Sequence, residues 1–276
     1  MRCDGKRLRM PPYNQIVPYI ETRRCDSQNN VRVDIDIDPV AEYIASLREE
    51  MPDAPQVSYM ALIIAAYVRA LRKYPQVNRF IKGKKFYQRK DITVCFVMLK
   101  SRENDGSHEE TVLKIKLDPD ATLFDVCGQI NRAVEENSAA THENITDKLL
   151  ALILRAGPVV SLVVGLIKVM DYFGFAPRAI VEGSPFHAGL FITNLMSIRA
   201  KYVYHHLYEF GTNSMFASMG ACERRLEMRG GQVVEKSYMP LGVTLDERIC
   251  SGFEFICFLR EFESYMRKPK RLETLD

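Results

Sequence analysis

The sequence has no strong excess of either charge. Its 38 lysines and arginines stand against 35 aspartates and glutamates, which gives a formal net charge of +3. Proteins that bind nucleic acid or an anionic surface through their overall charge are usually far more basic. We therefore expect no nucleic-acid partner. Hydrophobic residues make up 47% of the chain, which excludes a disordered or fibrous protein and indicates a globular one.

Paired cysteines and an export signal are also missing. The seven cysteines include no C-x-x-C pair, and their odd number leaves at least one outside any internal disulfide. Pro11 and Pro12 follow the basic N-terminal residues, where a signal peptide would place an apolar run. The sequence therefore predicts a cytoplasmic protein with all seven thiols reduced.

No apolar run is long enough to predict a membrane span. The most apolar stretch, 149–170, is interrupted by Arg155, by the Gly157-Pro158 break and by Lys168, whereas a span needs about 20 residues without charge. We expect no transmembrane segment here. The stretch is interpreted as two helical pieces that pack on protein.

Periodicity along the chain predicts a single α+β domain, 1–276, with a mixed sheet. Residues 31–37 alternate between apolar and charged side chains, as in a half-buried strand. Asp38 is expected to cap a helix to about residue 50, and Ser58 a largely buried helix to about residue 74. Further strands are expected at 86–88, 92–99, 112–117, 190–193, 215–219 and 233–245, with a turn at 103–110. Further helices are expected after 118–120 to about 136, within 145–173, and at 253–267.

Familiar catalytic motifs are absent. The sequence has no glycine-rich phosphate loop, no G-x-S-x-G and no H-E-x-x-H, and its five histidines are not at metal-binding spacing with cysteines. We expect no metal. His205 and His206 are adjacent, so they can line one site together only if they lie in a loop. A structural or surface role is the favoured interpretation of this pair.

Three segments resemble a known family in the right order. Residues 57–98 contain Y-P-Q-V-N at 74–78, similar to the K-x-P-x-x-N element of dihydrolipoyl acyltransferases. Residues 191–195, F-I-T-N-L, are similar to the family's F-T-I-S-N-L, and 241–252, LGVTLDERICSG, correspond to L-S-x-x-x-D-H-R-x-x-D-G. The chain thus resembles, over about 12–270, the catalytic domain of 2-oxo acid dehydrogenase acyltransferases and chloramphenicol acetyltransferase. It has an extra apolar insertion at about 145–185.

The resemblance implies a homotrimer with active sites between subunits. Each site would be a channel entered by coenzyme A from one side and by a small acceptor from the other. The family's motif histidine acts as general base and a strand hydroxyl stabilises the oxyanion. Here Thr193 supplies the hydroxyl, but Glu247 replaces the histidine and Ser251 replaces the motif aspartate. The remaining motif residues keep their places, namely Asn194, Asp246, Arg248 and Gly252.

Two functions therefore remain open. A free glutamate, with a pKa of about 4.3 against about 6.5 for histidine, is a poorer base and brings negative charge beside an oxyanion. Glu247 would then either serve an altered acyltransferase or form an ion pair with an arginine in a non-catalytic binding or assembly protein. A continuous channel to Glu247 and Thr193 would favour the enzyme. No lipoyl or peripheral-subunit-binding domain is expected, and the insertion is expected to pack on the sheet or a neighbour, or to form a lid or partner surface.

Overall fold

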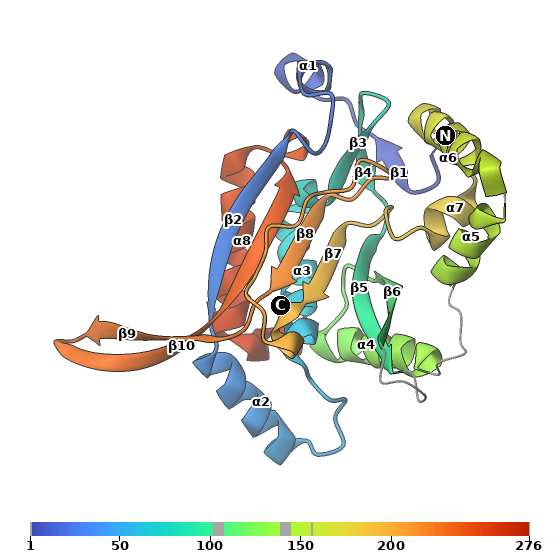
Figure 1. Ribbon diagram of the computed structural model, residues 1–276. Coiled ribbons are helices and arrows are strands. Elements are labelled where there is room, and N and C mark those ends of the chain that lie inside the picture. Colours follow the sequence, from blue (N-terminus) through green and yellow to red (C-terminus); the bar gives the residue numbers. More distant parts are fainter. Residues whose placement is uncertain (1, 102–107, 139–144, 156, 276) are drawn as a thin grey trace.

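A mixed sheet forms the centre of the fold (Figure 1). The computed structural model describes residues 2–101, 108–138, 145–155 and 157–275. The sheet has the order β2-β10-β8-β7-β5-β6, with β9 paired to β10 beyond this path. Strands β5, β7 and β8 are parallel to one another, whereas β2, β10 and β6 run antiparallel to their neighbours. This topology confirms the predicted α+β class.

The strands of this sheet are β2 (Gln28–Asp36), β5 (Ile92–Ser101), β6 (His108–Leu117), β7 (Leu190–Asn194), β8 (Met215–Met219), β9 (Glu223–Arg229) and β10 (Gln232–Asp246). A second, three-stranded sheet has the order β1-β4-β3, with β1 (Gly5–Arg7), β3 (Arg79–Lys82) and β4 (Lys85–Arg89). The helices are α1 (Pro12–Ile20), α2 (Asp38–Glu50), α3 (Tyr59–Lys73), α4 (Leu123–Asn137), α5 (Ile145–Leu154), α6 (Val160–Phe173), α7 (Arg178–Gly183) and α8 (Gly252–Arg267).

Helices cover one face of the main sheet. Helix α3 lies between α4 and α8, and Figure 1 shows the three behind the strands. Because α3 is enclosed on all sides, residues 61–71 are all buried, as its nearly all-apolar sequence predicts. Ser58 caps α3, and its hydroxyl accepts a hydrogen bond from the Ala61 N–H at 3.1 Å. This cap confirms the predicted start of the helix.

The opposite face of the sheet is covered by irregular chain. Phe191 of β7 and Phe216 of β8 stack there with ring centroids 5.0 Å apart, and Leu207 packs against them. Residues that alternate with these two, such as Ile192 and Ala217, face the main core instead. The sheet is therefore apolar on both faces near β7 and β8.

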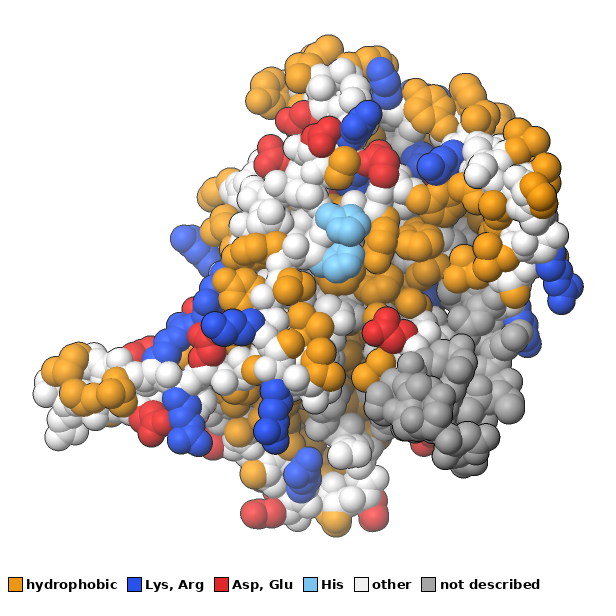
Figure 2. Space-filling model, in the orientation of Figure 1, with side chains coloured by type: hydrophobic (Ala, Val, Ile, Leu, Met, Phe, Trp, Pro, Cys, Tyr) orange, Lys and Arg blue, Asp and Glu red, His pale blue; other side chains and the backbone are white. Residues whose placement is uncertain are grey.

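The apolar insertion forms two helical pieces, as predicted. It forms α5 and α6 at one side of the sheet, but the only α6 side chains that are fully buried are Ile167 and Asp171. Leu162 is 73% exposed and Phe173 is 64% exposed, so a single chain does not cover this helix. Figure 2 shows hydrophobic side chains gathered over α6 and α1. Among the described residues no single helix could cross a membrane; only α5 and 157–173 taken together have the length and composition, and they are bent by 104°.

Two helix starts differ from the prediction. Ile37 is the N-cap of α2, and Asp38 is its first residue, with no side-chain cap. Thr122, rather than the 118–120 segment, caps α4 through a reciprocal capping box with Asp125. Strands β5 and β6 pair antiparallel, as a turn between them implies. The predicted turn at 103–110 is too long, because residues 108–110 belong to β6; residues 103–107 lie outside the described part of the chain. The short elements β1, β3, α1, α7 and β9 were not predicted.

Candidate functional site

The motif loop follows directly from the end of β10. Asp246 is the last residue of the strand, and residues 247–249 form a single 3-10 turn. The Asp246 carboxylate accepts a hydrogen bond from the Arg248 N–H at 3.3 Å, and the Asp246 N–H donates to the Ser214 carbonyl at 3.0 Å. These bonds fix the direction in which the chain leaves the sheet.

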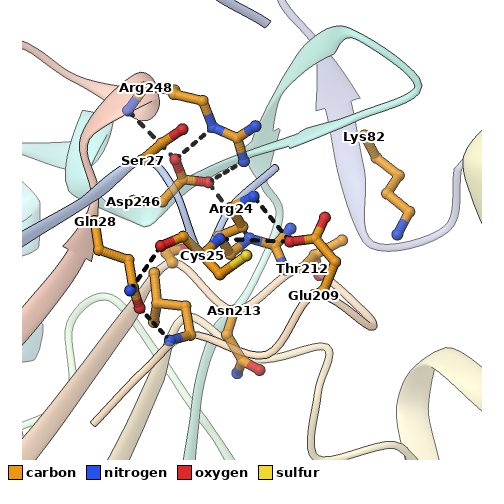
Figure 3. Close-up of polar contacts among 12 residues, drawn as sticks. Arg24, Cys25, Ser27, Gln28, Lys82, Glu209, Thr212, Asn213, Asp246 and Arg248 are labelled. Carbon is orange, nitrogen blue, oxygen red and sulfur yellow. Dashed lines mark hydrogen bonds and ion pairs between the residues drawn. The ribbon is translucent and has the colours of Figure 1, made fainter. Parts of the chain in front are cut away.

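Two buried arginines converge on the Asp246 carboxylate (Figure 3). Arg248 makes a bidentate pair with it, since its Nε and one terminal nitrogen both lie 2.8 Å from the two carboxylate oxygens. Arg24, from the segment before β2, lies 3.4 Å away through its Nε. All three side chains are at most 5% exposed. The loop is therefore held by a buried ionic cluster that joins two distant parts of the chain.

The two arginines differ electrostatically. Burial lowers the pKa of Arg24, and the neighbouring Arg248 charge adds to this effect against the attraction of Asp246. Burial also opposes the charge of Arg248, but its hydrogen bonds to Asp246 raise its pKa overall. Arg24 further donates to the carbonyls of Tyr208 and Gly211 at 2.7 and 3.1 Å. Asp246 is thus the counter-charge that two buried cations share.

Ser251 keeps the structural role that an aspartate can fill at a helix start. Its hydroxyl accepts a hydrogen bond from the Glu254 N–H at 3.2 Å, and the Glu254 carboxylate accepts one from the Ser251 N–H at 2.8 Å. This is a capping box at the start of α8, with Gly252 as the first helical residue. Serine and aspartate are both good N-caps, so the loss of the motif aspartate leaves this turn intact.

Glu247 lies on the surface of the chain. Its N–H donates to the Ser27 carbonyl at 3.0 Å, which ties the loop to the start of β2, and its side chain is exposed. Among the residues that the structure describes, the Glu247 carboxylate has no hydrogen-bond or ion-pair partner. Within the described part of the chain, Glu247 therefore makes no ion pair with an arginine, since Arg24 and Arg248 bind Asp246 instead.

Thr193 and Glu247 lie at opposite ends of the sheet. Thr193 pairs with Ser218 of β8, which pairs in turn with Gly242 of β10. Asp246 lies four residues beyond Gly242, about 13 Å along the strand, and β7 is about 10 Å from β10 across the sheet. One chain consequently does not bring these two side chains together.

A groove opens beside the Thr193 end. It has a volume of about 510 Å³ and lies between α2, the start of α3 and the end of β7, with Arg48, Tyr59, Asn194 and Met196 among its lining residues. The Asn194 side chain accepts a hydrogen bond from the Ser197 N–H at 3.3 Å, so it also shapes the turn after β7. Within one chain this groove does not form a channel that joins Thr193 to Glu247.

The histidine pair lies near the Glu247 end, in a loop. His205 and His206 stack with ring centroids 4.6 Å apart, and His205 also stacks on Phe216 at 4.0 Å. Figure 2 shows histidine side chains at the centre of the visible face. The next residue, Leu207, donates its N–H to the Gln28 side chain at 2.6 Å, and Gln28 is opposite Asp246 in the sheet. The loop geometry meets the condition under which both rings can line one surface.

Sequence reasoning missed several residues of this region. Arg24 and Glu209 join the motif loop to the segment before β2, since the Glu209 carboxylate accepts the Arg24 N–H at 2.9 Å. Neither residue stands in a recognisable motif, so no local signal marks them. The described residues contain no group of three or more histidine, cysteine or acidic side chains placed to hold a metal ion.

Comparison with known proteins agrees with the resemblance. Residues 27–100 match the sequence model of the 2-oxoacid dehydrogenases acyltransferase (catalytic domain) family. No curated protein matches the chain by sequence. Among solved structures, a probable dihydrolipoamide acetyltransferase from Listeria monocytogenes is 14% identical with a TM-score of 0.57, covering 95% of this chain and 94% of that one.

Two further structures have the same fold. Chloramphenicol acetyltransferase is 12% identical with a TM-score of 0.54, covering 95% of this chain and 99% of its own. The dihydrolipoamide acetyltransferase of Azotobacter vinelandii is 12% identical with a TM-score of 0.56, covering 96% and 93%, and has been studied for the role of a serine, a histidine and an asparagine in its catalytic mechanism. The resemblance predicted from the sequence is therefore confirmed. The chain has the chloramphenicol-acetyltransferase-like fold, and 27–100 match the acyltransferase family.

Proposed function

We propose that this protein is a homotrimeric acyltransferase that transfers an acyl group from coenzyme A to a small acceptor. Each active site would lie in a channel between two subunits, with Glu247 from one and Thr193 from the next. Glu247 would act as the base that takes the acceptor proton, and the Thr193 hydroxyl would donate a hydrogen bond to the oxyanion. Asn194 would support the strand end that carries Thr193.

One observation carries the proposal. The cluster of Arg24, Asp246 and Arg248 holds the motif loop, while the Glu247 carboxylate has no partner among the described residues. A side chain that serves only to hold the loop would be expected to take part in that cluster. The exposed position instead leaves the carboxylate available to a second subunit or to a substrate.

The separation of the two site residues supports the trimer. Thr193 and Glu247 lie at opposite ends of the sheet, so they can act on one substrate only if a second copy brings its own residue. The family resemblance implies such a trimer, and cyclic assembly repeats the same interface three times. The exposed apolar residues of α6 offer additional surface for contacts between subunits.

Acyl transfer can be tested directly. Purified protein is incubated with acetyl-coenzyme A and amine, hydroxyl and thiol acceptors, while release of the free coenzyme A thiol is followed. We expect Glu247→Gln to lower the rate about a hundredfold to ten-thousandfold, as loss of a positioned base does. Thr193→Val is expected to lower it about a hundredfold to a thousandfold.

The alternative is a non-catalytic binding or assembly protein. The replacement of the family histidine by Glu247 favours it, because a carboxylate disfavours a neighbouring oxyanion. Glu247→His together with Ser251→Asp distinguishes the two functions, since it restores both motif residues on an intact loop. If neither the wild type nor this double variant binds coenzyme A in calorimetry, the enzyme proposal fails and the alternative stands.

A further inference from the structure

A second cavity lies beside strands β5 and β6. It has a volume of about 270 Å³ and lies where the N-terminal residues meet the start of β5, the end of β6 and α7. Neither Thr193 nor Glu247 is among its lining residues, so it is distinct from the proposed acyl-transfer site. We name it the Lys114 cavity; its lining includes Cys3, Asp4, Arg89, Lys114, Val181 and His187.

Positive charge in and behind this cavity exceeds negative charge. Asp91 and Glu182 also line it, but each is paired with its own cation, Lys116 or Arg178. Asp4 accepts two hydrogen bonds from Arg2, at 2.9 and 3.0 Å, which neutralise it. Behind the wall, Asp171 is paired with Arg2 at 2.7 Å and with Lys82 at 2.8 Å. Among the described residues, Arg89 and Lys114 have no carboxylate within ion-pair distance. Two cations at the cavity thus have no carboxylate in direct contact with them.

These cations keep free hydrogen-bond donors. The Lys114 ammonium donates to the carbonyls of Val181 and Ser184, both at 2.9 Å, so one of its three N–H bonds remains. Arg89 is 5% exposed, and its terminal nitrogens donate hydrogen bonds to Thr212 and Ser214. Its Nε has no partner among the described residues.

One nitrogen of the His187 ring is also unsatisfied. The side chain is 0% exposed, and its Nε2 faces the Asp171 carboxylate at 3.5 Å. Its Nδ1 has no hydrogen-bond partner among the described residues. Buried polar groups in native proteins nearly always find a partner, so unsatisfied donors around one cavity point to a ligand.

We propose that the Lys114 cavity binds a small organic acid, whose carboxylate is held by Lys114, Arg89 and His187. Its volume corresponds to roughly nine water molecules at about 30 Å³ each, which is more room than a single inorganic ion needs. Val181 and Cys3 provide an apolar border for the carbon part of the ligand.

The electrostatics of the cavity agree with this assignment. Burial lowers the pKa of Lys114 to about 8 and that of Arg89 to about 10, which shows the cost of their unpaired charges. Asp4 and Glu182 favour the Lys114 charge and Arg89 opposes it, while burial keeps the Cys95 thiol nearby protonated. A bound carboxylate would supply the missing negative charge.

Calorimetry on the full chain tests the proposal with acetate, pyruvate, butyrate, benzoate, succinate and inorganic phosphate as probes. We expect saturable binding of at least one carboxylate, with one site per chain. Lys114→Met should weaken it tenfold or more, whereas Lys73→Met, which removes an exposed lysine paired with Glu261, should change it less than twofold. Affinity should also fall about tenfold or more between pH 7 and pH 9.5, as Lys114 loses its proton.

Alkylation of the wild-type protein provides a test that needs no variant. Cys3 lines the cavity, whereas Cys25 and Cys222 are exposed elsewhere. A saturating ligand should slow iodoacetamide labelling of Cys3 at least fivefold and leave the other two unchanged, as read by peptide mass spectrometry. The proposal is overturned if no carboxylate binds or if phosphate alone binds. It is also overturned if a carboxylate binds but neither protects Cys3 nor binds more weakly at pH 9.5.

Discussion

Asp246→Asn tests the idea that one carboxylate holds the motif loop. The substitution keeps the shape of the side chain but removes the charge that Arg24 and Arg248 share. Breaking a buried ion pair by removing one partner costs about 3–5 kcal/mol, because the other charge is left uncompensated. Since two buried arginines lose their counter-charge here, we expect a loss of at least about 3 kcal/mol in the free energy of unfolding.

A matched control is available on the protein surface. Glu223 also binds two arginines, Arg32 at 2.9 Å and Arg225 at 3.0 Å, but these three side chains are 31–36% exposed. Exposed ion pairs contribute about 0–1 kcal/mol, so Glu223→Gln should cost no more than about 1 kcal/mol. The pair of variants differs chiefly in burial.

Urea unfolding followed by circular dichroism measures both variants against the wild type. All three proteins must be compared at one protomer concentration, because assembly stabilises the folded state by mass action. The reasoning is refuted if Asp246→Asn loses as little stability as Glu223→Gln.

Three further outcomes are expected. Ser251→Ala should cost about 1 kcal/mol in urea unfolding through loss of the α8 cap, and Ser251→Asp should stay within about 0.5 kcal/mol of the wild type; equal losses would contradict the cap. Burial lowers the pKa of His187 below its ordinary value. As the pH drops below about 6.5, His187 is therefore protonated in the unfolded chain before it is protonated in the folded one, and the free energy of unfolding decreases. His187→Gln should remove this contribution, which is at most about 1.4 kcal/mol per pH unit. The free energy of unfolding of the variant should therefore fall less steeply than that of the wild type from pH 7 to pH 5. The same slope in both proteins would count against this effect. Thiol titration of the unfolded, unreduced protein should find all seven cysteines; far fewer would indicate disulfides.

Local patterns predicted the elements that bury a regular face. The alternation at 31–37 lies in β2, and the cap at Ser58 opens α3, because both signals depend on neighbours in the sequence. Strand β1 and helix α1 are short and follow no long periodic pattern, so they escaped prediction. The predicted N-cap of α4 was wrong because several residues before the helix are good N-caps, and only the backbone geometry selects Thr122.

The candidate site was predictable only where it follows the chain. The motif residues Asp246 and Arg248 are two positions apart, so a sequence pattern finds them. Arg24 lies 222 positions from Asp246 and meets it only through the pairing of β2 with β10. The Lys114 cavity likewise combines β4, β6 and the segment after α7, which no linear motif connects.

Mixing two inactive variants tests whether Glu247 and Thr193 act together across a subunit interface. Glu247→Gln and Thr193→Val subunits are co-refolded in equal amounts, and thiol release from acetyl-coenzyme A is compared with each variant alone. If every site takes its glutamate from one subunit and its threonine from the next, random trimers restore about a quarter of the wild-type rate. If the wild type is active but the mixed trimers recover no activity, the site is not shared between subunits in this way. A wild type without coenzyme-A-dependent turnover would contradict the proposed acyl transfer itself.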